Sequence, residues 1–202
     1  GALSVQTDAA APDGGRINHG VRKSRELLME INRAGVPTAI ELGDTITPQF
    51  FADLLSWACV SAESETLREL VSGLSMPVGL RAPAAPDGSA EDGAAAADAL
   101  KQAGSAHAFM GVTSHGLAGI VQSKGNPDCS VVLGGGNGSP QDRAAAVLAE
   151  CARLGGGAAV IAECGGGGLA AAQQAQMAEK VVAAVAAGEG APRGLVLSSY
   201  LL

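Results

Sequence analysis

Several side chains that can take part in chemistry stand where short apolar runs of this sequence end. They are Glu41, Asp44, Arg81, Ser114, His115, Glu163, Cys164, Ser198 and Tyr200. Short apolar runs predict buried β-strands, and ligands of α/β proteins bind beyond the carboxyl ends of such strands. We therefore expect these side chains to meet at one end of a sheet and to line a pocket there.

Three members of this set have the side chains that acid–base catalysis requires. Glu41 or His115 would act as the base, and Arg81 would stabilise an oxyanion or bind a carboxylate. The other members would line the pocket. A simpler interpretation is that Glu41 and Arg81 form a buried ion pair with no catalytic role. An isolated histidine such as His115 is also more often structural than catalytic.

Two glycine-rich segments, 134–136 and 165–168, follow expected strands and precede expected helices. Glycine there lets backbone amides approach a phosphate, but the spacing matches neither dinucleotide-binding nor phosphate-loop motifs. Ordinary turns explain these segments as well. His19, His107 and His115 are isolated, without metal-ligand spacing. We expect no metal and no cofactor.

Composition narrows the functional classes. The chain has 202 residues, 47% of them hydrophobic and 16% charged, which predicts a globular domain. The net charge is −7 without a run of Lys and Arg, so nucleic acid is not an expected partner. No apolar run is long enough to span a membrane, and residues 1–16 lack the basic start of a signal peptide. Four widely spaced cysteines predict free thiols and a cytoplasmic location.

The elements that must position these residues alternate between helix and strand. Helices are expected over 19–34, 65–74, 94–104, 141–154 and 169–187, and another begins at 48. Strands are expected over 36–42, 56–62, 76–80, 108–113, 119–122, 130–133, 158–161 and 194–197, the fourth and fifth forming a hairpin. Asn18 and Thr47 are expected N-caps, and Gly35 should end the first helix. Residues 1–16 would be a flexible arm and 17–202 a single parallel α/β domain.

Four stretches together resemble the type I synthases of 3-deoxy-D-arabino-heptulosonate 7-phosphate (DAHP). They are INHGVRKSRELLMEINRAGVPTAIELGDTITPQFFADLLSWACVSA, RELVSGLSMPVGL, FMGVTSHGLAGIVQSKGNPDCSVVLGGG and AAGEGAPRGLVLSS. The similarity runs from Ile17 to Leu202. It implies a (β/α)8 barrel and an enzyme that condenses phosphoenolpyruvate with erythrose 4-phosphate at a divalent metal. About six of the eight strands are matched, which predicts an incomplete TIM-type barrel.

The departures from the family pattern fall on its functional positions. Phosphate-binding Arg and Lys residues of the family are matched by Glu63, Arg81 and Gly134, and metal-binding His and Glu residues by Gly165 and Ser198. The family's metal-binding Cys and Asp have no counterpart in the matched stretches. Glu41 and Asp44, by contrast, match a GEFLD segment of the family.

These departures predict that the chain does not make DAHP. One expectation is a repurposed, metal-independent catalyst that cyclises, isomerises or dehydrates a small, uncharged or weakly charged molecule in the barrel cup, as in secondary metabolism. The alternative is a non-catalytic pseudoenzyme that regulates or stabilises an active DAHP synthase. A six-strand remnant would expose two sheet edges, so either the N-terminal arm covers the opening or a second copy does. We expect a homodimer.

Overall fold

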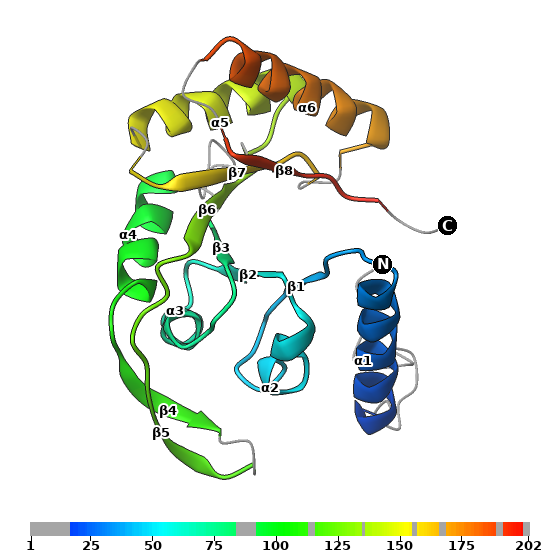
Figure 1. The fold of residues 1–202 in the computed structure, drawn as a ribbon. Helices are drawn as coiled ribbons and strands as arrows, with labels where there is room; N and C mark the ends of the chain where they lie inside the picture. The colour runs from blue at the N-terminus through cyan, green and yellow to red at the C-terminus, as the bar shows by residue number, and fades with distance from the viewer. Residues whose placement is uncertain are drawn as a thin grey trace.

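Six short parallel strands form the centre of the computed structural model, in the order β1-β2-β3-β6-β7-β8. The structure describes residues 17–83, 92–112, 116–134, 136–154, 157–165, 169–188 and 192–199. The strands of this sheet are β1 (Ala39–Glu41), β2 (Trp57–Ser61), β3 (Val78–Arg81), β6 (Cys129–Leu133), β7 (Ala159–Glu163) and β8 (Gly194–Val196). The sheet curls into a half-barrel whose open side lies between β1 and β8 (Figure 1). The expected incomplete barrel of six strands is confirmed.

Helices cover the convex side of this sheet (Figure 1). They are α3 (Glu65–Ser72), α4 (Gly93–Ala103), α5 (Pro140–Leu154) and α6 (Ala171–Ala186). The remaining helical segments, near β1, are α1 (Ile17–Arg33), α2 (Pro48–Phe51) and a 3-10 turn, η1 (Ala52–Leu54). Among the described residues, no helix is long and apolar enough to cross a membrane.

The core lies between the convex face of the sheet and its helices. Side chains on successive residues of a strand point to opposite faces, and the convex-facing ones are almost completely buried. They include Ala58, Val60, Val78, Leu80, Val131, Leu133, Val160 and Ala162. The alternate residues, among them Cys59 and Arg81, consequently face the hollow of the half-barrel.

The residues that begin α1 and α2 are not capped as expected, whereas the end of α1 is. Helix α1 begins at Ile17, so Asn18 lies inside its first turn and is not its N-cap. Gly35 does end it, with a φ of 79°, and the Val36 N–H reaches the Ile31 carbonyl at 3.2 Å, as in a Schellman motif. Thr47 has helical backbone angles and makes no capping hydrogen bond.

Asp44 performs the capping role expected of Thr47. Its carboxylate accepts hydrogen bonds from the backbone N–H groups of Ile46 and Thr47, both at 2.7 Å, and from the Thr47 hydroxyl at 2.6 Å. A carboxylate satisfies several unpaired N–H groups more fully than a single hydroxyl can, which explains why the aspartate takes this position.

The expected hairpin is present as β4 (Ala108–Val112) and β5 (Ala118–Gln122), which pair antiparallel. It projects away from the half-barrel (Figure 1). Cross-strand partners share one face, so Phe109 and Val121 lie on one side and Met110 and Ile120 on the other. Phe109 is buried, whereas Met110 is 68% exposed and Ile120 is 74% exposed.

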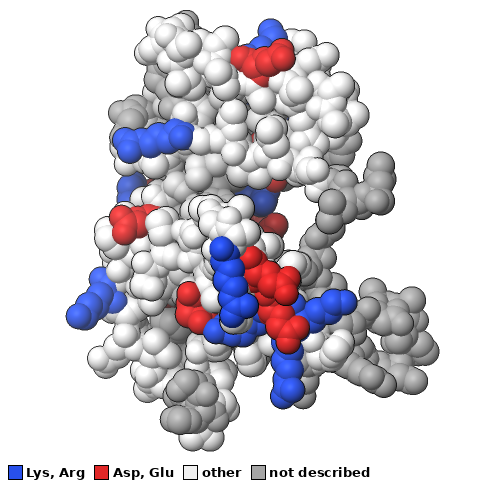
Figure 2. All heavy atoms as spheres, turned by 45° about the vertical axis from the view of Figure 1, so that its right-hand side comes forward, with Lys and Arg blue, Asp and Glu red and all other residues white. Residues whose placement is uncertain are grey.

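Positive and negative side chains are mixed on the face shown in Figure 2, without a continuous basic stripe there. One surface ion pair joins Arg25 to Asp53, with the guanidinium 2.6 Å from the carboxylate. The Arg25 side chain is 38% exposed and that of Asp53 is 61% exposed. Exposed pairs of this kind contribute little to stability.

Candidate functional site

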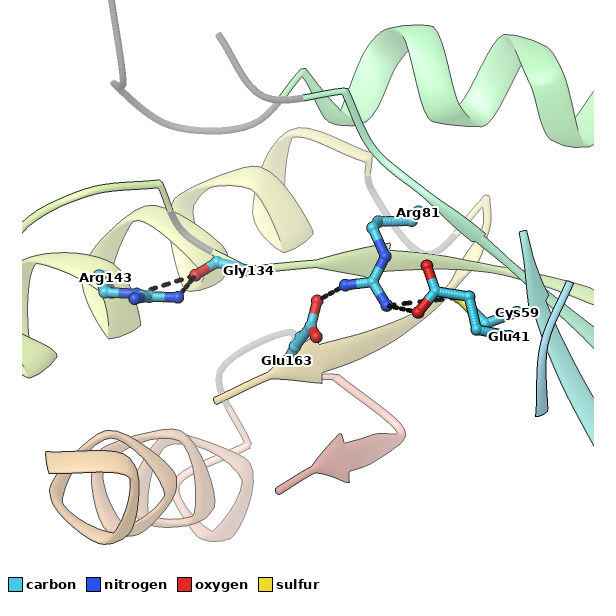
Figure 3. Close-up of polar contacts among 6 residues, drawn as sticks. All are labelled: Glu41, Cys59, Arg81, Gly134, Arg143 and Glu163. Atoms are coloured by element: carbon cyan, nitrogen blue, oxygen red, sulfur yellow. Dashed lines mark hydrogen bonds and ion pairs between the residues drawn. The ribbon is translucent and has the colours of Figure 1, made fainter. Parts of the chain in front are cut away.

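The carboxyl ends of β1, β3 and β7 bring three charged side chains together in the hollow of the half-barrel (Figure 3). Glu41, Arg81 and Glu163 surround a cavity of about 230 Å³. The lining residues that the structure describes are Ala39, Ile40, Glu41, Trp57, Cys59, Arg81, Val132, Glu163, Val196 and Ser198. The cavity therefore combines a small charged cluster with a largely apolar wall.

Arg81 is the centre of the charged cluster. Its Nη1 donates to Glu163, and its Nη2 lies 3.4 Å from Glu41 Oε2. The Glu163 side chain is only 10% exposed, that of Arg81 is 30% exposed and that of Glu41 is 64% exposed. The inner pair is thus Arg81–Glu163, and Glu41 stands at the solvent side.

The Nε donor of Arg81 is buried and makes no hydrogen bond within the described part of the chain. Leaving a buried donor unpaired costs about 1–3 kcal/mol, so a water or ligand atom that accepts from this group would be favourable.

Cys59 lies beside the same guanidinium, with its Sγ 3.9 Å from Arg81 Nη2. Burial raises the pKa of this thiol to about 11, against the opposing effect of the Arg81 charge. Because the thiolate is the reactive form, Cys59 is a neutral wall residue at physiological pH and not a nucleophile.

The apolar wall depends on a glycine. A Cβ at Gly79 would lie 2.3 Å from Trp57 Cζ2 and 2.6 Å from Val132 Cγ2. The edge of the indole therefore occupies the space that a side chain at position 79 would need. The absence of a side chain on β3 lets Trp57 of β2 lie across the neighbouring strand and form the floor of the hollow.

A second close contact lies where β7 and β8 end. A Cβ at Gly165 would lie 2.1 Å from Ser198 Oγ and 2.8 Å from its backbone nitrogen. The buried Gln174 of α6 holds Ser198 in place, since its Oε1 accepts from the Ser198 N–H at 2.9 Å. Positions 165 and 198, which the resemblance matches to two metal ligands, are thus direct neighbours.

A buried arginine supports the end of β6. Arg143 of α5 is 3% exposed, and its Nε and Nη2 donate to the Gly134 carbonyl at 3.1 and 2.8 Å (Figure 3). Its charge opposes the effect of burial, which raises the pKa of the Cys164 thiol. This arginine lies apart from the residues that line the cavity.

The described side chains do not fit a divalent metal at the cavity. Within the described ranges, no group of three or more His, Cys, Asp or Glu side chains is placed to hold a metal ion. Gly165 offers no donor, and the Ser198 hydroxyl is a weak one. Glu163 is already paired with Arg81.

The structure brings four of the expected site residues together: Glu41, Arg81, Glu163 and Ser198 all line the cavity. Cys164 does not join them, because its side chain belongs to the hydrophobic core. The Asp44 carboxylate does not line the cavity either and caps the start of α2 instead. Ser114, His115 and Tyr200 lie outside the described residues.

The ion pair expected between Glu41 and Arg81 is present but is not buried, since Glu41 is mostly exposed. Sequence reasoning missed Glu163 as the closer partner, as well as Trp57 and Cys59. The period-two alternation of residues 57–61 would have placed Trp57 and Cys59 on one face. It could not show that this face is the hollow one. All four cysteines are free, as expected, and all four are buried.

Comparisons with known proteins point to one family of enzymes. Residues 13–201 match the DAHP synthetase I family. The Phe-sensitive phospho-2-dehydro-3-deoxyheptonate aldolase of Escherichia coli K12 is 46% identical over 124 residues, which cover 60% of this chain and 34% of that protein. The corresponding aldolase of Haemophilus influenzae is 42% identical over 144 residues, which cover 69% of this chain and 38% of that protein.

A solved structure shows that the fold also resembles that of such an aldolase. The phospho-2-dehydro-3-deoxyheptonate aldolase of Francisella tularensis aligns with a TM-score of 0.81 at 29% identity, covering 98% of this chain and 59% of that one. The chain matches little more than a third of the length of its curated relatives. Since the family match covers nearly the whole chain, the protein belongs to the DAHP synthetase I family.

Proposed function

We propose that the chain does not make DAHP and that its cavity is the site of a repurposed, metal-independent catalyst. The substrate would be small and uncharged or weakly charged, and the reaction a cyclisation, isomerisation or dehydration. The observation that carries this proposal is the Arg81 guanidinium, held between Glu163 and Glu41 in an otherwise apolar cavity.

Three matched positions support the absence of DAHP chemistry. Glu63 is exposed and has a negative charge where the family has a phosphate-binding Arg. Gly134 has no side chain, and the charge of Arg81 is balanced by Glu163. Two phosphorylated substrates side by side would repel each other strongly without compensating cations.

The geometry suits proton transfer next to a polarised oxygen. Glu41 would accept a proton from a carbon beside a carbonyl group, and Arg81 would stabilise the negative charge that develops on the carbonyl oxygen. Glu163 would be a positioning residue that fixes the orientation of Arg81. Return of the proton from Glu41 to a different carbon completes an isomerisation, and its transfer to a departing β-hydroxyl group, which leaves as water, completes a dehydration.

The first experiment is an assay for DAHP with phosphoenolpyruvate, erythrose 4-phosphate and Mn²⁺. We expect no product above that of a blank without protein, and formation of DAHP would overturn the proposal. A parallel screen would measure the shift in melting temperature with small neutral and phosphorylated molecules. We expect uncharged or weakly charged compounds to stabilise the protein and phosphorylated ones not to do so.

Catalysis in the cavity is then tested by following the conversion of each compound that stabilises the protein in the screen. The variant Glu41→Gln should abolish turnover while leaving the melting temperature unchanged, because the Glu41 side chain is 64% exposed. Glu26→Gln is the matched control, since Glu26 lies on α1 and is exposed. Equal turnover by both variants would remove Glu41 from the mechanism.

A second candidate function is that of a non-catalytic partner of an active DAHP synthase. It is favoured by the apolar outer face of the hairpin, defined by Met110 and Ile120, with Leu117 nearby and 67% exposed. Exposed apolar patches mark interaction sites. Co-purification with a full-length synthase that is lost in a Met110→Lys/Ile120→Lys variant would support this function.

We also propose that the protein is a cytoplasmic homodimer. The four free cysteines support a reducing compartment. Within the described residues, β1 and β8 each have a neighbour on one side only, and unpaired strand edges favour association.

A further inference from the structure

The charges around the cavity do not cancel. Among the described residues, its lining contains two carboxylates, Glu41 and Glu163, and one guanidinium, Arg81, which leaves one negative charge in excess. Arg81 and Glu163 form the close inner pair, whereas Glu41 is 3.4 Å from Arg81 and largely exposed. The other Glu41 oxygen accepts no hydrogen bond from the described residues. The excess charge therefore resides on Glu41, at the mouth of the cavity.

An aromatic ring lies in the same cavity. Trp57 is the single tryptophan of a chain in which only 2% of residues are aromatic, and its indole lies across Gly79 on the floor of the hollow. Tryptophan is the aromatic residue that attracts cations most strongly, and the attraction grows when the cation is partly desolvated. A carboxylate at the mouth and an indole on the floor both favour a positively charged group.

The volume of the cavity and its aliphatic side chains limit the part of the ligand that carries no charge. A volume of about 230 Å³ is below the range of about 300–1,000 Å³ that is usual for drug-sized ligands. Ile40, Val132 and Val196 make the wall apolar. An anion would have to compete with Glu163 for Arg81 and approach Glu41 against repulsion, and a neutral molecule can donate a hydrogen bond to Glu41 but does not balance its charge.

We propose that this cavity binds a small organic cation, a compact apolar skeleton with one ammonium group held between Glu41 and Trp57. The inference rests on the proposed function, because it takes the same cavity as the ligand site, and it specifies the chemical class of that ligand. The apolar skeleton contacts the aliphatic wall, and the ammonium group balances the charge of Glu41.

The single tryptophan makes the test site-specific, because all indole fluorescence comes from the cavity floor. Three probes of similar size would be titrated against the full chain: cyclohexylammonium, cyclohexanol and cyclohexanecarboxylate. We expect cyclohexylammonium to bind about tenfold more tightly than cyclohexanol and the carboxylate to bind most weakly. Added salt should weaken binding of the ammonium probe alone.

Two variants identify the source of the preference. Glu41→Gln should reduce the affinity for cyclohexylammonium to that for cyclohexanol, and the control Glu26→Gln should leave the tenfold difference intact. Melting temperatures of both variants would confirm that they are folded. Equal binding of the three probes, or tighter binding of cyclohexanecarboxylate, would overturn the inference while leaving a ligand site in the cavity. No binding of any probe would also overturn it, whereas the proposed function is decided separately by the DAHP assay and the turnover of Glu41→Gln.

Discussion

Arg81 shows how strongly one residue depends on a distant partner. It is 82 positions away from Glu163 in the chain, and its removal would leave a carboxylate that is only 10% exposed. We expect Arg81→Met to lower the free energy of unfolding by about 3 kcal/mol, because an unpaired buried charge is costly. Urea denaturation followed by circular dichroism measures this change.

The control for that prediction is the double variant Arg81→Met/Glu163→Leu. Removing both charges should restore more than half of the lost stability, since no buried charge then remains. Equal destabilisation of the single and double variants would show that Arg81 contributes through its packing and not through the ion pair.

Gly79 is the residue on which the position of Trp57 depends. We expect Gly79→Ala to lower the free energy of unfolding by about 1–3 kcal/mol, because the new methyl group overlaps the indole, and to shift the tryptophan emission maximum. Gly43→Ala is the matched control, since a Cβ there meets nothing within 4 Å. An unchanged emission maximum in Gly79→Ala would contradict the arrangement of this floor.

At the scale of the elements, the start of α2 depends on one carboxylate. Partial burial is the largest single influence on the Asp44 pKa and acts to raise it. Hydrogen bonds from the Thr47 hydroxyl and from the Thr47 and Ile46 N–H groups outweigh burial and leave the pKa below its ordinary value. A lowered pKa means that Asp44 adds stability above its ordinary pKa and that this contribution is lost as the pH falls.

The prediction for Asp44 is accordingly pH-dependent. At pH 6 we expect Asp44→Asn to be about 0.5 kcal/mol less stable than the parent chain, because Asn keeps the accepting oxygen and loses only the negative charge. As the pH falls below about 4, the ordinary value for an aspartate, the two proteins should converge in stability. Urea midpoints across this range measure the difference, and a gap that persists at low pH would contradict the role of the carboxylate.

The hairpin gives a comparison between adjacent residues of one strand. Phe109 is 8% exposed and Met110 is 68% exposed, on opposite faces of β4. We expect Phe109→Ala to cost about 3 kcal/mol and Met110→Ala to change the free energy of unfolding by less than about 0.5 kcal/mol. Thermal unfolding measures both, and similar losses would show that the outer face is covered in solution.

At the scale of the whole molecule, the open half-barrel predicts association. We expect sedimentation velocity to show dimers whose fraction grows with concentration. Leu195→Lys should reduce that fraction, because Leu195 is on the edge strand β8 and 36% exposed. Leu27→Lys on α1, at 38% exposure, should have no effect. A monomer at every concentration would contradict the prediction.

The elements themselves were largely predictable from local sequence. The alternation of helices and short apolar strands, the hairpin and the termination of α1 at Gly35 are all confirmed, with most ends displaced by one to three residues. The expected strand 36–42 shrinks to the three residues of β1, since its outer residue Val36 is 54% exposed and an apolar run does not show how much of it a neighbouring strand pairs.

The sequence by itself determined the family, the number of strands and the gathering of Glu41, Arg81, Glu163 and Ser198 at strand ends. These features depend on local patterns and on matched stretches. Only the tertiary structure decided that Arg81 pairs chiefly with Glu163, that Trp57 lies across Gly79, and that Cys164 points into the core. Such contacts join residues on different strands, so they depend on the register and curl of the sheet, which no single stretch of sequence specifies.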